Sequence, residues 1–185
     1  MKTIIIGGSA GSFNLILSIL KGLDKEMNIP IVIILHRLKN TKTILEDYLQ
    51  LESHYIVKEG EDKEFIKAGY IYTAPSDYHL LLNENLSFSL DASEEINYSR
   101  PSIDVSFESF SCVLKENCCG ILLSGANQDG AKGLKIIAEN RGETIVQDCN
   151  EAEFESMPRA AIEIYKNHTV CTLNTIIKKM NSYAK

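Results

Sequence analysis

The residues best suited to chemistry begin with a serine in the run Gly7-Gly8-Ser9-Ala10-Gly11. The run fits G-x-S-x-G and lies where an apolar stretch gives way to an amphipathic one. That junction predicts a serine exposed on a tight turn at the N-terminus of a helix. A serine hydroxyl is a poor nucleophile at neutral pH, so catalysis also requires a nearby base and usually a carboxylate that orients the base.

Of the four histidines, His36 is the most suitable base. It directly follows the apolar run 31–35, whose lack of alternation is typical of a strand covered on both faces. A right-handed crossover makes this strand the neighbour of the first one, so the imidazole should face the serine at the carboxyl ends of two adjacent strands. The other histidines are interpreted as surface or structural residues, with exposed positions expected for His54 and His168 and a hairpin strand beginning at His79.

A carboxylate from the end of another central strand should orient the imidazole. Asp129 is the first choice, because it lies in a glycine-bracketed loop that can also turn backbone N–H groups toward a developing oxyanion. Asp148, after the following strand, is the second choice, whereas Asp104 falls within an expected helix. Together with Ser9 and His36, Asp129 predicts a serine hydrolase.

The glycine-rich turn could instead hold the phosphate of a nucleotide. A dinucleotide site would need glycine in place of Ser9 and an acidic residue where His36 ends the second strand, and no P-loop lysine follows the turn. We therefore predict no cofactor. We also predict no metal site, because the five cysteines are odd in number and form no C-x-x-C pair, which indicates reduced and mostly buried thiols.

The elements that position these residues follow from the hydrophobic pattern, in which short β-branched runs alternate with helical stretches and predict an α/β chain. Expected strands lie at 3–8, 31–35, 120–124 and 143–147, and expected helices at 12–23, 41–51, 101–115, 131–140, 158–166 and 174–180. Thr43 is a possible cap of the second helix, and Pro101 suits the first turn of the third. Short strands at 55–58, 70–74, 79–82 and 86–90 predict an antiparallel hairpin region inserted between the parallel strands.

Bulk properties limit the possible functions. A chain of 185 residues, 44% hydrophobic and 24% charged, is typical of one ordinary globular domain. A net charge of −6 without a basic cluster excludes a nucleic-acid partner, and no apolar run reaches the roughly 18 residues that cross a bilayer. The first residues lack a signal peptide's apolar region, so we expect a cytoplasmic protein with no membrane insertion.

Six segments, in order, resemble the catalytic domain of CheB-type chemotaxis methylesterases. They are 8–11, 35–37, 71–75 with 78–80, 100–105, 123–134, and 144–148 with 157–162. The resemblance implies one catalytic domain over residues 1–185, without a receiver domain. It also implies a doubly wound, mostly parallel sheet flanked by helices, a Rossmann-like three-layer sandwich, with an antiparallel hairpin. By this resemblance Ser9 is the nucleophile, His36 the general base and acid, and Asp129 the carboxylate that holds the imidazole.

The implied function is protein-glutamate methylesterase in chemotaxis: hydrolysis of glutamate methyl esters on a methyl-accepting chemoreceptor, and deamidation of receptor glutamines. Family members commonly carry an N-terminal receiver domain, which we do not expect in this chain, so regulation would come from a separate receiver-domain protein or be absent. The chain departs from the family at Ala10, usually threonine, and at Ala126 and Asn127, where the family usually reads Met-Gly. These positions surround the expected oxyanion hole, and we expect Asn127 to need a positive φ.

Two alternatives remain open. The departures around the oxyanion hole would fit a catalytically idle homologue that docks in a signalling complex, and the same residues would also serve an esterase for another ester. Arg37, Arg100 and Arg159 are candidates for substrate recognition, although a surface arginine is more often a solvated charge.

Overall fold

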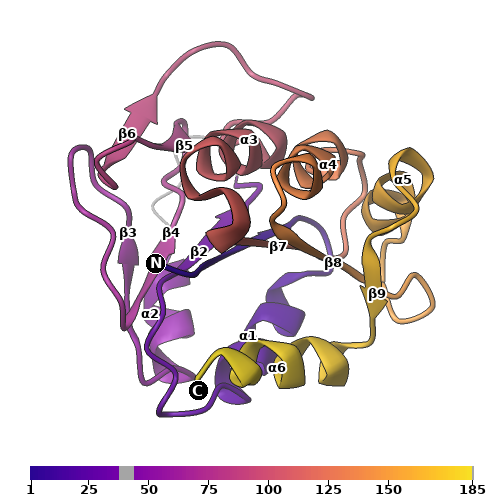
Figure 1. Cartoon of the computed structure of the whole chain (residues 1–185), viewed down its shortest axis with the longest axis horizontal. Coiled ribbons are helices and arrows are strands. Elements are labelled where there is room, and N and C mark those ends of the chain that lie inside the picture. The colour runs from indigo at the N-terminus through magenta and orange to yellow at the C-terminus, as the bar shows by residue number, and fades with distance from the viewer. Residues whose placement is uncertain (38–43, 185) are drawn as a thin grey trace.

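The computed structural model describes residues 1–37 and 44–184. Within them, seven strands form one parallel sheet in the order β3-β4-β2-β1-β7-β8-β9 (Figure 1). The strands are β1 (Thr3–Gly8), β2 (Ile31–Leu35), β3 (Ile56–Glu59), β4 (Tyr70–Thr73), β7 (Cys118–Leu122), β8 (Glu143–Gln147) and β9 (Thr169–Cys171). The order extends from β1 in two directions, so β1 and β7 flank the topological switch point, where open α/β sheets bind ligands. The predicted doubly wound sheet is confirmed.

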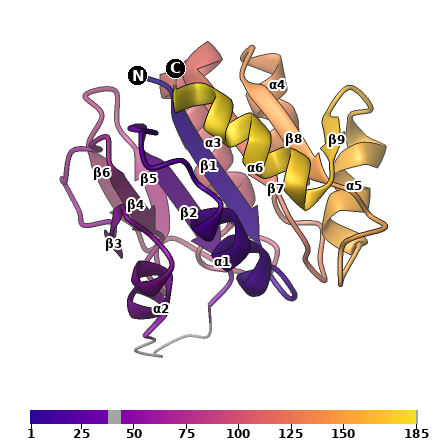
Figure 2. The same ribbon diagram turned by 90° about the horizontal axis from the view of Figure 1, so that it is seen from below.

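Helices cover both faces of this sheet. One layer holds α3 (Ile103–Leu114), α4 (Ala131–Glu139) and α5 (Ser156–Ile164), and the other holds α1 (Phe13–Lys21), α2 (Leu45–Leu51) and α6 (Leu173–Asn181) (Figure 1). Figure 2 shows the second layer from below, with α1 and α6 in contact across the centre of the sheet. The arrangement is the three-layer sandwich that the sequence predicts.

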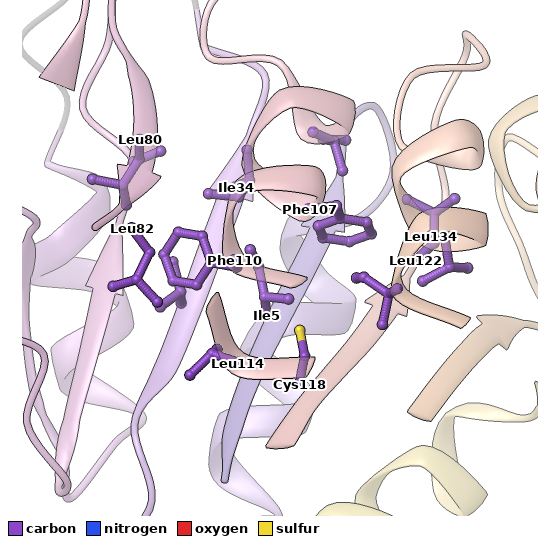
Figure 3. Packing of buried hydrophobic residues seen from close by; sticks show 14 of the residues in the cluster. Ile5, Ile34, Leu80, Leu82, Phe107, Phe110, Leu114, Cys118, Leu122 and Leu134 are labelled. Carbon is purple, nitrogen blue, oxygen red and sulfur yellow. The ribbon is translucent and has the colours of Figure 1, made fainter. Parts of the chain in front are cut away.

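Alternation along the central strands divides the core into two clusters. Ile5 of β1 and Ile34 of β2 face the α3 side, where Phe107 and Phe110 pack on them (Figure 3). The intervening isoleucines of β1 and β2 face α1 and α6. All residues of β1, β2 and β7 are buried, which is why these strands are continuous apolar runs rather than alternating ones.

The predicted hairpin region is partly wrong. Only β5 (His79–Leu82) and β6 (Phe88–Asp91) pair antiparallel, as a separate two-stranded sheet, whereas β3 and β4 join the main sheet in parallel. Short apolar runs give no information on strand direction, because side-chain alternation is the same in parallel and antiparallel pairs. The sequence also gave no sign of β9, a three-residue edge strand with two exposed residues.

Helix boundaries differ from the predictions by a few residues. Helix α3 begins at Ile103, with the Ser102 hydroxyl as its N-cap, so the expectation that Pro101 lies in the first turn is wrong. Helix α5 begins at Ser156, two residues before the predicted start. The predicted helix 41–51 is observed as α2, and its possible cap Thr43 lies outside the described residues.

Three of the five cysteines, Cys118, Cys119 and Cys171, are buried as predicted, whereas Cys149 is partly buried and Cys112 is exposed. Burial is the main reason that the pKa of the Cys119 thiol rises to about 11. A buried thiol with a raised pKa stays protonated and unreactive at neutral pH, which fits a packing role for this residue.

His168, which we expected to be exposed, is buried with 6% of its surface accessible. Its Nδ1 lies 2.8 Å from Thr144 Oγ1, and the edge of its ring packs against Tyr165. The ring Nε2 has no hydrogen-bond partner in the described part of the chain. Burial lowers the pKa of His168 to about 4.

The neutral state of His168 makes folding sensitive to mild acid. The folded pKa lies below the ordinary value of 6.5, so the contribution of this residue to stability is complete above pH 6.5 and is lost as the pH falls toward 4. Lowering the pH from 7 to 5 should reduce the free energy of unfolding by about 2 kcal/mol through His168. Urea unfolding at pH 7 and pH 5 would measure this loss. In His168→Gln the loss of unfolding free energy between the two pH values should be smaller than in the native protein by that amount. Equal losses in the two proteins would contradict a neutral buried imidazole.

Candidate active site

The three residues singled out by the sequence each follow a strand of the switch region. Ser9 comes directly after β1 and His36 directly after β2, while Asp129 ends the loop between β7 and α4. The parallel ladder continues just beyond the strands: the His36 N–H donates to the Gly8 carbonyl at 3.4 Å, and the Ser9 N–H donates to the Ser124 carbonyl at 3.0 Å. The register therefore brings the three segments to one edge of the sheet.

The side chains of these residues form a continuous hydrogen-bonded line. His36 Nδ1 lies 3.1 Å from Ser9 Oγ, and His36 Nε2 lies 2.8 Å from Asp129 Oδ2. An ionised carboxylate can only accept, so the Nε2 atom carries the imidazole proton and Nδ1 is left to accept from the serine hydroxyl. The Asp129 side chain is fully buried, whereas 14% of the His36 side chain is accessible. The imidazole thus separates a buried charge from a half-buried hydroxyl.

Asp129 is held at the N-terminus of α3. Its Oδ2 accepts from the Ile103 N–H at 2.7 Å, and its Oδ1 accepts from the Ser102 hydroxyl at 2.8 Å and the Asp104 N–H at 3.2 Å. Burial alone would raise the pKa of Asp129, but the hydrogen bonds from His36, Ile103 and Asn97 outweigh it and lower the pKa. The positive end of the helix dipole also favours the ionised carboxylate.

Asn97 and Asp104 complete this environment. The Asn97 amide donates to Asp129 Oδ1 and to Asp104 Oδ2, both at 3.0 Å, so one side chain links two neighbouring carboxylates. Burial and the nearby Asp129 charge raise the pKa of Asp104, which also accepts from the Gly133 N–H at 2.7 Å. Sequence reasoning placed Asp104 in a helix but gave it no part in the site, and it missed Asn97. In the structure Asn97 lies in the turn Ile96-Asn97-Tyr98-Ser99, which is closed by reciprocal backbone hydrogen bonds.

Two glycines shape the turn that carries Ser9. Gly11 has a φ of +75°, a conformation that L side chains rarely adopt. Gly7 permits close approach of α3, because a Cβ at this position would lie 2.4 Å from Ile103 Cγ2. The G-x-S-x-G spacing therefore reflects both the sharp turn and the contact that brings the N-terminus of α3 to the site.

The loop of residues 125–129 differs from expectation at Asn127. This residue does not adopt the positive φ that we expected. Its side chain instead accepts from the Asp129 N–H at 3.1 Å, a local turn that asparagine readily forms and that glycine cannot. The backbone N–H groups of Ala126 and Asn127 donate to no acceptor within the described residues, so both remain available to a ligand.

The remaining polar candidates lie elsewhere. Asp148, the second choice for the carboxylate, caps its own loop by accepting from Asn150 and makes no contact with the imidazole. Arg37 is not a solvated charge: its side chain is 5% accessible and donates to Glu59, Glu46 and the Ala74 carbonyl. Arg100 donates to two carbonyls of its own loop.

An open groove of about 530 Å³ adjoins the loop of residues 125–129. It is lined by Asn97, Tyr98, Asn127, Gln128, Ser156, Arg159, Ala160 and Glu163. Tyr98 stands at the tip of its turn with 98% of its surface accessible, and it also lines a second hollow. Of the three candidate arginines, only Arg159 lines this groove, where it forms an ion pair with Glu155.

Residues 1–37 and 44–184 contain no group of three or more His, Cys, Asp or Glu side chains arranged to hold a metal ion. In the same residues, no helix combines the length and apolar character that crossing a membrane requires.

Comparisons with known proteins show the family of the chain. A family model described as CheB methylesterase matches residues 4–180. A Leptospira interrogans protein, whose name provisionally assigns it as a protein-glutamate methylesterase/protein-glutamine glutaminase, is 43% identical over 175 residues, covering 95% of this chain and 91% of that protein. The Thermotoga maritima protein-glutamate methylesterase/protein-glutamine glutaminase is 33% identical over 165 residues, covering 88% of this chain but 48% of that protein.

A solved structure extends the likeness to the fold. The crystal structure of the Thermotoga maritima CheB methylesterase catalytic domain aligns with a TM-score of 0.92 and 30% sequence identity. The alignment covers 98% of this chain and 97% of that one. The chain therefore matches a whole catalytic domain, while spanning about half of the longer Thermotoga maritima relative.

Proposed function

Since this chain belongs to the CheB methylesterase family, we propose that it hydrolyses glutamate γ-methyl esters on a methyl-accepting chemoreceptor, giving glutamate and methanol. The observation that carries this proposal is the line from Ser9 Oγ through His36 to Asp129, with hydrogen bonds of 3.1 and 2.8 Å. A nucleophile, a base and an orienting carboxylate are the groups that acyl transfer through a serine requires.

The proposed reaction has two halves. Ser9 Oγ attacks the ester carbonyl carbon while His36 Nδ1 takes the hydroxyl proton, and the tetrahedral intermediate collapses as Nδ1 returns that proton to the departing methoxy oxygen. Methanol leaves and an acyl-enzyme remains. Water then attacks the acyl carbon, His36 Nδ1 takes a proton from the water and delivers it to Ser9 Oγ, and glutamate is released. Asp129 keeps the proton on Nε2 and stabilises the imidazolium at each stage.

The same steps would deamidate glutamine. An amide carbonyl in place of the ester leads to the same acyl-enzyme, with ammonia as the leaving group in place of methanol. The names of the relatives pair these two activities. We further propose a cytoplasmic location, which five unpaired cysteines support because such thiols are typical of reducing compartments.

The experiment that tests this proposal is methanol release from a methylated receptor. Purified protein and the methylated cytoplasmic segment of a chemoreceptor should yield methanol and glutamate in equal amounts, read by gas chromatography and by peptide mass. Unmethylated receptor should yield no methanol. Methanol no greater than in the absence of the protein would contradict the function and would favour the alternative of an idle docking homologue.

The groove beside the site offers a place for a protein substrate, and the almost fully exposed Tyr98 lines it. Removal of its ring in Tyr98→Ala should raise KM for methylated receptor about tenfold, since an exposed aromatic anchor commonly contributes on the order of 1–2 kcal/mol to an interface. Turnover of a small ester should be unchanged. Steady-state kinetics with both substrates would measure this.

A matched control is Tyr48→Ala, because Tyr48 is a half-exposed tyrosine on α2 that does not line the groove. It should leave KM for methylated receptor unchanged. An equal rise of KM in both variants, or no rise in Tyr98→Ala, would exclude the groove as the place where receptor docks.

A further inference from the structure

In the turn that carries Ser9, the N–H of the residue that follows the nucleophile, Ala10, has no partner within the described residues. The Ser9 N–H donates to the Ser124 carbonyl at 3.0 Å, and the Ser9 carbonyl accepts from the Ser12 N–H at 3.1 Å and from the Ser12 hydroxyl at 2.6 Å. The Ala10 carbonyl accepts from the Ser124 hydroxyl at 2.9 Å. Among the backbone polar groups of residues 9 and 10, only the Ala10 N–H has no partner in the described part of the chain.

Peptide geometry fixes the direction of that donor. The Ser9 carbonyl and the Ala10 N–H belong to one planar trans peptide, in which the C=O and N–H bonds point in opposite directions. Ser12, which is fully buried, holds the carbonyl side with two hydrogen bonds, so the N–H side is directed away from the core at an exposed residue. The Ser124 hydroxyl donates to the Ala10 carbonyl, which is the next one along the chain, and so restrains rotation of the peptide between Ser9 and Ala10.

The bonding of Ser12 is unusual for its position. It immediately precedes α1, where a serine hydroxyl ordinarily accepts a backbone N–H from the first turn of the helix. Here the hydroxyl makes no such cap and donates back to Ser9 instead. The side chain therefore stabilises the turn rather than the helix.

Ser124 is held from three directions. Its N–H donates to Gln147 Oε1 at 2.8 Å, its carbonyl accepts from the Ser9 N–H, and its hydroxyl accepts from the Phe154 N–H at 2.9 Å. Ser124 is fully buried, as is nearly all of Gln147. The residue thus links the nucleophile turn to β8 and to the loop before α5.

We propose that Ser12 and Ser124 are positioning residues that aim the Ala10 N–H at the oxyanion of the tetrahedral intermediate. When Ser9 Oγ bonds to the ester carbon, the π electrons of the carbonyl move to its oxygen, and the Ala10 N–H donates to that charge. The inference rests on the proposed ester hydrolysis. It also explains why alanine suffices at position 10, since the backbone rather than the side chain supplies the donor.

The test uses Ser12→Ala and Ser124→Ala, each of which removes one hydroxyl and adds no atoms. Fluorophosphonate titration would count the active sites, so that kcat refers to competent molecules. We expect kcat on methylated receptor to fall about 10- to 100-fold with KM unchanged, somewhat less than the loss of a whole oxyanion donor.

The affinity for a boronic acid distinguishes a positioning role from a merely structural one, because a residue that only supported the fold would leave this affinity unchanged. Ser9 Oγ adds to the trigonal boron, the hydroxyl proton passes to His36, and the boron becomes tetrahedral and negatively charged, like the intermediate. In the two variants, the affinity for the boronic acid should fall by the same factor as kcat, because both quantities depend on stabilisation of a negatively charged adduct of Ser9. Ser18→Ala is the matched control: it lies on α1, and its hydroxyl also donates to a backbone carbonyl, that of Asn14, at 2.9 Å on the exposed side. It should retain native values.

The outcomes separate this inference from the proposed function. Native kcat and native boronate affinity in both variants would overturn it, and so would a loss of activity explained entirely by fewer titratable sites. If one variant fails to fold, the other decides, because the two hydroxyls come from different elements. Weakened boronate binding in the variants, even if the native protein released no methanol, would support the positioning role and count only against the substrate.

Discussion

Replacement of Ser9 with alanine is expected to lower the rate of methyl ester hydrolysis by about 10⁴-fold or more. Without Oγ no acyl-enzyme forms, and only the backbone donors and substrate binding remain to assist direct attack by water. The Ser9 side chain is half-buried and contacts His36 at 3.1 Å, so its loss should leave the fold intact. Methanol release from methylated receptor would measure the rate, and thermal unfolding would confirm that the variant is folded.

A Ser9→Ala protein that is folded and keeps a rate within tenfold of native would contradict covalent catalysis by this residue. Receptor deamidation should fall in parallel, because both reactions pass through the same acyl-enzyme. Loss of methanol release with retained deamidation would show that the two activities use different nucleophiles, against the mechanism proposed.

Substitution of Asp129 by asparagine should have the second largest effect, lowering kcat about 10³- to 10⁴-fold. The carboxylate accepts five donors, from His36, Asn97, Ser102, Ile103 and Asp104. In either orientation of the asparagine side chain, its amide nitrogen would lie against N–H or O–H donors. An amide nitrogen cannot accept from these groups, so they would lose their acceptor. An amide nitrogen facing the imidazole would also favour the tautomer with its proton on Nδ1, which cannot accept from Ser9.

The same change should reduce the free energy of unfolding by on the order of 1–3 kcal/mol, because buried donors lose their acceptor. Asp104→Asn is the control for this effect. Asp104 is also buried and also accepts from Asn97, but it makes no contact with His36. Its stability loss should be similar or smaller, and its kcat should stay within about tenfold of native. Equal losses of kcat in the two variants would show that Asp129 acts through packing alone.

The convergence of the three predicted residues could be inferred from the sequence because it depends on a general property of parallel sheets. Strand bounds at 3–8, 31–35 and 143–147 were predicted as they are observed, since each is a short apolar run with clear ends. Once β1 and β2 are parallel neighbours, the residues that follow them must lie side by side. Asp129 followed from the glycines on either side of its loop.

The support of the site could not be predicted in the same way. Asn97 lies 32 positions from Asp129 in the sequence, and the two residues meet only in the folded chain. No local pattern marks such a contact. The burial of His168 was missed for a related reason, because its immediate neighbours are exposed and the pocket that covers it comes from Thr144 and Tyr165. Strand direction between residues 55 and 90 likewise depends on the fold as a whole.

Helix α3 connects the core and the candidate site. Its inner face packs Phe107 and Phe110 against the sheet (Figure 3). Its N-terminus holds the Asp129 carboxylate. Gly7 lets this helix approach β1 closely enough for both contacts. Changes that loosen the α3 core are therefore expected to disturb the carboxylate, even where they are remote from Ser9.

The proposed Ser9–His36–Asp129 relay is tested most directly by an active-site fluorophosphonate. We expect the probe to label the native protein at Ser9, identified by peptide mass, and to label His36→Ala at least 10³-fold more slowly, since the hydroxyl then has no base. Labelling at another residue, or at Ser9 with the same rate in both proteins, would contradict the relay.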